Sequence, residues 1–131
     1  MTWKTVSWSL VCFNVLPALA ALADGVPVQE RFLARGAQAE AAIVIGQESG
    51  PFYRWVAGEV QRYVRQLSGA ELPIATAEAL PPLKNLIVLG GPKVNPLAAA
   101  AEQKELVRFA GLKPDGLVLK TVELDGRSAI V

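Results

Sequence analysis

The sequence predicts an α/β (or α+β) domain built on a mixed sheet of about five strands with two helices, in the chain order β-α-β-β-α-β-β. Two short runs, residues 41–46 and 86–91, are apolar up to a closing glycine, which is typical of strands buried on both faces. Residues 52–67 repeat apolar side chains at helical spacing. Asp125-Gly126 stands between two apolar segments and indicates a hairpin turn.

The first helix, over residues 52–67, is the most strongly patterned element. We expect Ser49 or Gly50 to cap it, Pro51 to lie in its first turn, and Gly69 to end it in the left-handed conformation. Six apolar residues share one stripe at about 100° per residue and are expected to face the core. They are Phe52, Val56, Val60, Tyr63, Val64 and Leu67.

The strands at 41–46 and 86–91 are expected at the centre of the sheet, because both are continuous apolar runs. A shorter strand is expected over residues 72–76. Pro73 cannot donate a ladder hydrogen bond, so this strand is expected to lie at an edge or to begin at that residue. The sheet should therefore have apolar central strands and shorter edge strands with fewer ladder hydrogen bonds.

The second half of the chain is expected to add one helix and one hairpin. The helix is predicted over residues 96–109, with Asn95 as its cap and Gly111 beyond its end. Residues 116–124 and 128–131 are expected to be the two hairpin strands. Because the sequence stops on an apolar strand, we expect the domain to be incomplete at its C-terminus, with residues 128–131 as an unpaired edge.

Residues 1–23 resemble an export signal. Lys4 precedes the largely apolar residues 6–16, Pro17 breaks any helix, and Ala21-Leu22-Ala23 is a cleavage site of the A-x-A type. The alternative is a retained anchor, but the apolar run is shorter than the roughly 20 residues that span a bilayer. We therefore expect an exported protein, periplasmic or extracellular, without a stable membrane anchor. Residues 24–40 are expected to be a leader or linker before the domain at 41–131.

Composition excludes several function classes. The 13 basic and 12 acidic residues give a net charge of +1, which argues against a nucleic-acid partner. The absence of histidine excludes a Ser-His-Asp or Cys-His mechanism and a histidine-ligated metal within this chain. The single Cys12 can form neither an internal disulfide nor a four-cysteine zinc site. We expect no metal and no cofactor.

The sequence offers no catalytic constellation. Residues 46–50 follow a strand and precede a helix, but they match no phosphate-binding motif, so an ordinary loop is expected there. Glycoside hydrolysis needs two carboxylates across a sugar-sized gap. Glu102 and Glu105 share a predicted helix face, but acids at this spacing on an alanine-rich helix are usually solvated. We expect no catalytic residue in this chain.

Trp55 is the one residue that departs from the pattern of its helix. It lies outside the predicted core stripe, near Glu59, Arg62 and Gln66. Three interpretations remain open: Trp55 belongs to a domain interface, it forms the edge of a wider core stripe, or it stacks on a sugar. We take Trp55 and Arg62 as candidate residues of a domain interface.

Four segments carry a resemblance to a known family: residues 42–46, 57–74, 85–91 and 115–120. The most specific part is the end of the first helix, Ser68-Gly69-Ala70-Glu71-Leu72-Pro73-Ile74. From about Ala41 to Val131 the chain resembles the N-terminal domain that precedes the catalytic barrel of alpha-glucuronidases and bacterial beta-N-acetylhexosaminidases.

This resemblance implies an α/β sandwich without catalytic residues, because the acids of that family lie on the barrel. It also implies a Gly-rich turn and a further helix after the last strand, which this sequence lacks. The expected function is that of a non-catalytic accessory domain of an exported glycoside hydrolase, whose partner is the following catalytic domain of the same polypeptide. The alternative is an exported carbohydrate-binding or scaffold module with no hydrolase attached.

Overall fold

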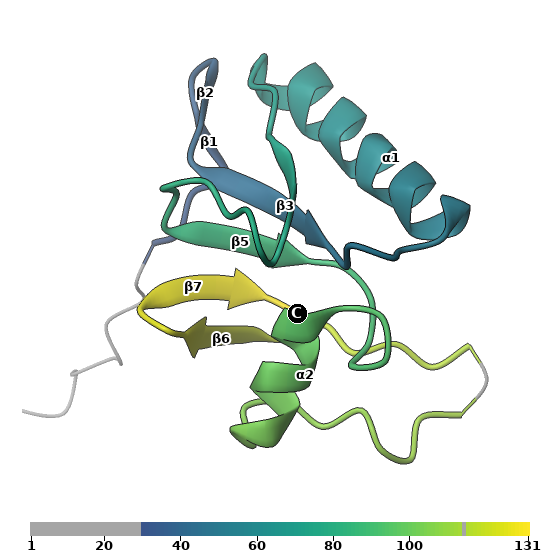
Figure 1. Ribbon diagram of the computed structural model, residues 1–131. Helices are drawn as coiled ribbons and strands as arrows, with labels where there is room; N and C mark the ends of the chain where they lie inside the picture. The colour runs from purple at the N-terminus through teal and green to yellow at the C-terminus, as the bar shows by residue number, and fades with distance from the viewer. Residues whose placement is uncertain (1–29, 114) are drawn as a thin grey trace, which may run out of the picture.

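The computed structural model describes residues 30–113 and 115–131, and the predicted export signal lies outside these residues (Figure 1). The predicted fold class is confirmed: two helices accompany a mixed five-stranded sheet of order β4-β3-β5-β7-β6, and a two-stranded sheet, β1-β2, precedes them. The elements are β1 (Ala34–Arg35), β2 (Gln38–Ala39), β3 (Ala41–Ile45), α1 (Pro51–Ser68), β4 (Ile74–Thr76), β5 (Asn85–Val88), α2 (Pro96–Gln103), β6 (Thr121–Leu124) and β7 (Arg127–Ile130).

The two most apolar strands lie inside the sheet, as their composition predicts. All five residues of β3 are buried, and β3 pairs in parallel with β4 on one side and β5 on the other. β4 lies at the edge, and the Pro73 carbonyl before it accepts a hydrogen bond from the Ile43 amide at 2.9 Å. β7 continues the parallel part beside β5, and only β6 runs antiparallel.

The sheet separates two apolar cores. One face of β3 and β5 packs with α2 and with the inner side chains of the β6–β7 hairpin, in a cluster that includes Ala98 and Ala101. The opposite face packs with α1 through Ala57 and includes Ile43 and Ile87. Strand side chains alternate between faces, so the continuous apolar run of β3 supplies both cores at once.

The predicted core stripe of α1 is wrong in part. Phe52, Tyr63 and Leu67 are exposed, and Leu67 retains 88% of its surface. The side that packs on the sheet carries the fully buried Ala57 together with the half-buried Val60 and Val64. The physical reason is that α1 approaches β3 most closely through its small side chains, which leaves the larger aromatic residues on a flank of the helix.

The second helix ends six residues earlier than predicted, at Gln103. Glu105 adopts a left-handed conformation with φ of 57°, and its amide donates to the Glu102 carbonyl at 2.9 Å. The Leu106 amide donates to the Ala101 carbonyl, also at 2.9 Å. These two bonds form a Schellman motif, which stops the helix without glycine. The predicted N-cap is confirmed, because the Asn95 side chain accepts from the Leu97 amide at 3.0 Å.

Two further segments differ from the expectation. Residues 34–39, placed in the leader, form the β1–β2 hairpin, in which Gly36 takes a positive φ of 55°. Leu33 and Ala39 beside it pack on the core under α1. Residues 128–131 are not an unpaired edge, because β7 lies between β5 and β6 and the Val131 amide donates to the Lys120 carbonyl at 2.8 Å. The Asp125-Gly126 turn is confirmed, with both residues at positive φ.

Candidate functional site

The two candidate interface residues lie on the outer flank of α1. Trp55 is 63% exposed, and its ring lies 6.4 Å from that of Phe52. Two turns further along, Arg62 donates to both carboxylate oxygens of Glu59, at 3.2 and 2.6 Å. The Arg62 guanidinium also lies 4.3 Å from the centre of the Tyr63 ring. The helix therefore places Trp55 and Arg62 on the same side, with an ion pair held between exposed aromatic rings.

The ion pair shifts the pKa of both of its partners. The hydrogen bonds from Arg62 lower the pKa of the Glu59 carboxyl below its ordinary value, against a smaller opposing effect of burial. The same hydrogen bonds raise the pKa of the Arg62 guanidinium. Glu59 therefore stays ionised at neutral pH, which suits a positioned charge and is the opposite of what a general acid needs.

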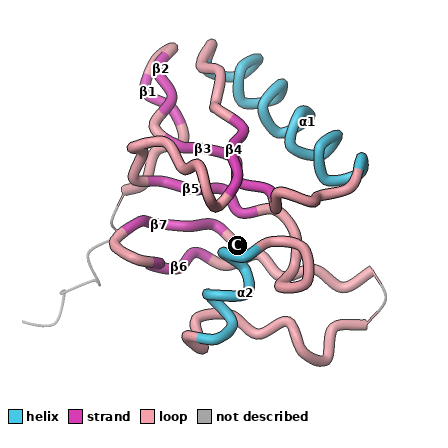
Figure 2. Tube along the Cα trace, in the orientation of Figure 1, coloured by secondary structure: helices cyan, strands magenta, loops and turns pink. Residues whose placement is uncertain are grey.

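The exposed flank of α1 continues into an apolar groove. The groove has a volume of about 790 Å³ and is lined by the first turn of α1, the carboxyl ends of β5 and β7, and the long loop before β6. Figure 2 shows the course of these segments along the backbone. Ile87 and Ile130 are register partners that line it, and Leu117 and Leu119 from the loop are largely exposed.

At the carboxyl ends of the two central strands, where open α/β sheets commonly bind ligands, the loop that follows β3 contacts the loop that follows β5. A Cβ atom on Gly46 would lie 1.6 Å from the carbonyl oxygen of Val94, so the two loops touch through their backbones. The Asn95 side chain ties the same junction together by donating to the carbonyls of Val44 and Leu89 at 3.0 and 2.9 Å.

The acids considered for catalysis do not converge. Glu102 lies on α2 and accepts a hydrogen bond from the Phe109 amide at 3.0 Å, whereas Glu105 lies beyond the end of that helix. Among residues 30–113 and 115–131, no group of three metal-ligating side chains comes together. In the same residues, no helix is both long and apolar enough to cross a bilayer.

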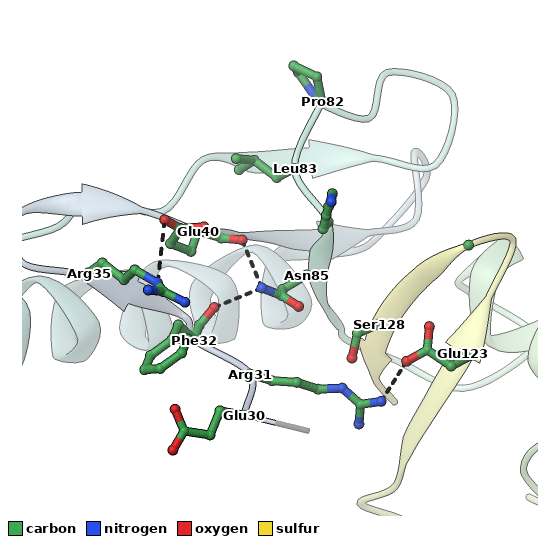
Figure 3. A pocket seen from close by; sticks show the side chains of 12 residues that line it. Glu30, Arg31, Phe32, Arg35, Glu40, Pro82, Leu83, Asn85, Glu123 and Ser128 are labelled. Atoms are coloured by element: carbon green, nitrogen blue, oxygen red, sulfur yellow. Dashed lines mark hydrogen bonds and ion pairs between the residues drawn. The ribbon is translucent and has the colours of Figure 1, made fainter. Parts of the chain in front are cut away.

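A polar pocket of about 500 Å³ opens at the amino ends of β3, β5 and β7 (Figure 3). Asn85 stands in its wall, and its Nδ2 donates to the carbonyls of Phe32 and Glu40 at 2.9 and 3.3 Å. The Arg31 side chain extends across the pocket, and its Nη2 forms an ion pair with Oε1 of Glu123 at 2.5 Å. These groups come from three segments far apart in the sequence, residues 31–40, 85 and 123, and meet only in the fold.

This pocket was not predicted from the sequence. Asn85 comes directly before a predicted strand, and Arg31 lies in the predicted leader, so neither residue stood out. A signal was nevertheless present: a single asparagine opens an otherwise apolar strand, and such a side chain needs hydrogen-bond partners when it is enclosed.

The fold and its surfaces define the class of protein as a small α/β domain with a polar pocket and an exposed aromatic helix flank. Neither a scan against models of protein families nor a search of curated proteins finds a match to this sequence.

Proposed function

We propose that this chain is a non-catalytic N-terminal accessory domain of an exported carbohydrate-active enzyme, a glycoside hydrolase of the alpha-glucuronidase or beta-N-acetylhexosaminidase kind. The domain packs against the catalytic barrel of the same polypeptide. The resemblance of residues 41–131 supports the enzyme class. The observation that carries the docking role is the exposed flank of α1, which presents Phe52, Trp55, Tyr63 and Leu67.

The chemistry of this flank suits a protein partner. Tryptophan, tyrosine and arginine are the residues that most often dominate the binding free energy of protein interfaces. Lysine is depleted in interfaces, and α1 contains none. The Glu59–Arg62 pair sits between Trp55 and Tyr63 and can hydrogen-bond a partner without leaving an unpaired charge.

The first test is the gene sequence that follows the codon for Val131. The proposal expects a region of roughly 250 residues or more, with paired carboxylates, as a barrel requires. A following sequence of another kind contradicts the enzyme class.

The second test concerns the surface. The downstream region and this chain are produced separately, and their binding is measured by calorimetry with the wild type and with Trp55→Ser. Loss of at least about tenfold in affinity is expected, because truncating an anchoring aromatic residue commonly costs 2 kcal/mol or more. Arg54→Ser is the matched control, since Arg54 is also exposed on α1 but takes no part in the ion pair with Glu59. Equal binding by the wild type and Trp55→Ser contradicts docking through this flank.

The second candidate function is an exported carbohydrate-binding or scaffold module without a hydrolase. The polar pocket at the amino ends of the strands is the observation that favours it.

A further inference from the structure

The polar pocket presents hydrogen-bonding groups whose orientation is determined by the fold. Both hydrogens of the Asn85 amide are used by the carbonyls of Phe32 and Glu40, so its Oδ1 is left as an acceptor on the pocket side (Figure 3). Arg31 uses one nitrogen on one oxygen of Glu123, which leaves further guanidinium donors and the second carboxylate oxygen. Ser128 adds a hydroxyl, which both donates and accepts.

A second group of side chains completes the wall. Arg35 lies 3.9 Å above the Phe32 ring, and its Nε is 3.9 Å from a Glu40 oxygen, so stacking holds the guanidinium in place. Pro82 and Leu83 provide an apolar side. The pocket therefore combines donors, acceptors and an apolar wall within one cavity.

The charges of the lining cancel. Three cations, Arg31, Arg35 and Lys84, stand against three carboxylates, Glu30, Glu40 and Glu123. The carboxylates would repel an anionic ligand, and the guanidinium groups would repel a cationic ligand. A hydroxyl group, which donates and accepts at once, matches a wall that alternates donors with acceptors.

We propose that this pocket binds an uncharged, polyhydroxylated ligand: a short neutral saccharide. The hydroxyls are bound by Asn85, Ser128 and the Arg31–Glu123 pair, and the C–H face of the ring packs on Leu83. This inference deepens the second candidate function, which rests on the same pocket. It stands or fails independently of the proposed docking of α1 on a catalytic domain.

The test uses the whole chain and ligands that differ only in charge. Glucose, glucuronate and glucosamine share one ring and are neutral, negative and positive, and cellobiose extends the neutral case. Amide chemical shifts in ¹H–¹⁵N NMR spectra are followed during titration. We expect millimolar binding of glucose and tighter binding of cellobiose, with shifts at the Asn85 side-chain amide and the Ser128 backbone amide. Glucuronate and glucosamine should bind at least about tenfold more weakly.

Two variants test whether the pocket side chains bind the ligand directly: one removes a hydroxyl and the other changes the charge of the lining. Ser128→Ala removes one hydroxyl and should weaken cellobiose about fivefold, the effect of one net hydrogen bond. Glu123→Gln gives the lining one excess positive charge, so the preference should move from glucose toward glucuronate. Glu71→Gln is the matched control, because it breaks an exposed ion pair with Arg65 outside the pocket and should leave both properties unchanged.

Three results would overturn the proposal. The first is the absence of chemical shift changes with cellobiose at concentrations well above the millimolar range. The second is binding of glucuronate or glucosamine by the wild type as tightly as glucose. The third is an equal effect of Glu71→Gln and Glu123→Gln on ligand preference, which would show that the pocket charge does not select the ligand.

Discussion

Gly46 is the residue on which the junction of the two central strands depends. A Cβ atom there would overlap the Val94 carbonyl oxygen at 1.6 Å, and backbone cannot move aside as a flexible side chain can. We expect Gly46→Ala to lower the free energy of unfolding by about 3 kcal/mol or more, the upper end of the cost of overpacking. Urea denaturation of the purified variant measures this change.

The matched control is the same substitution at Gly58, inside α1. Apart from the backbone of α1 itself and the two neighbouring residues, no heavy atom lies within 4 Å of the position that its Cβ would occupy. Gly58→Ala should therefore raise the free energy of unfolding by about 0.5–1 kcal/mol through the better helix propensity of alanine. Similar effects of the two substitutions would contradict the close approach at Gly46.

The Glu59–Arg62 pair should be measurable by pH titration. Because Arg62 lowers the pKa of Glu59 in the folded chain, the pair stabilises the fold above the ordinary value of 4.5. That contribution is lost as the pH falls through the lowered value. We expect Arg62→Gln to raise the pKa of Glu59 toward its ordinary value, as followed by NMR of the side-chain carboxyl. Arg54→Gln should leave the low pKa in place, and a shift of the same size there would refute this assignment.

The residue that terminates α2, Glu105, lies two positions after the last helical residue and is poorly suited to its backbone conformation. Glu105 is exposed and has φ of 57°, a region that costs a non-glycine residue about 1 kcal/mol. Glu105→Gly should therefore raise the free energy of unfolding by about 1 kcal/mol, measured by thermal or urea denaturation. Gln103→Gly, at the last helical residue, should lower it by about 0.5–1 kcal/mol. Destabilisation by Glu105→Gly would contradict the left-handed cap.

Helix α1 shows where pattern and packing diverge. Its length and its C-cap at Gly69 agree with the prediction, because both follow from local sequence. Its buried side does not agree, because Ala57, Val60 and Val64 lie against the sheet while the bulkier aromatic residues lie on the flank. Periodicity identifies an apolar stripe, but only contact with the sheet decides which side of the helix is enclosed.

For the whole molecule, we expect no glycosidase activity from this chain. The sequence lacks histidine, and Glu102 and Glu105 do not converge. Aryl glycosides and glucuronoxylan fragments are suitable substrates. Turnover that survives removal of host enzymes and is lost on changing one acid of this chain would refute the expectation.

The predicted export signal should be removed from the secreted protein. Cleavage after Ala23 should give secreted material that begins at Asp24, as read by N-terminal sequencing. In that material Trp55 is the only tryptophan, since the other two precede the cleavage site. Recovery of chains that retain Met1 from the membrane fraction would favour the retained anchor instead.

The sequence by itself determined the class of fold, the order of the elements along the chain, the central strands and the Asp125-Gly126 turn. These features depend on neighbouring residues: runs of β-branched side chains, a cap, a turn dipeptide. Tertiary structure alone decided the early end of α2, the inclusion of residues 34–39, the exposed flank of α1 and the polar pocket. The pocket joins Phe32, Asn85, Glu123 and Ser128 across as many as 96 positions of chain numbering. Such a site exists only after β5, β6 and β7 have paired, because pairing brings side chains that are distant in the sequence to the same end of the sheet.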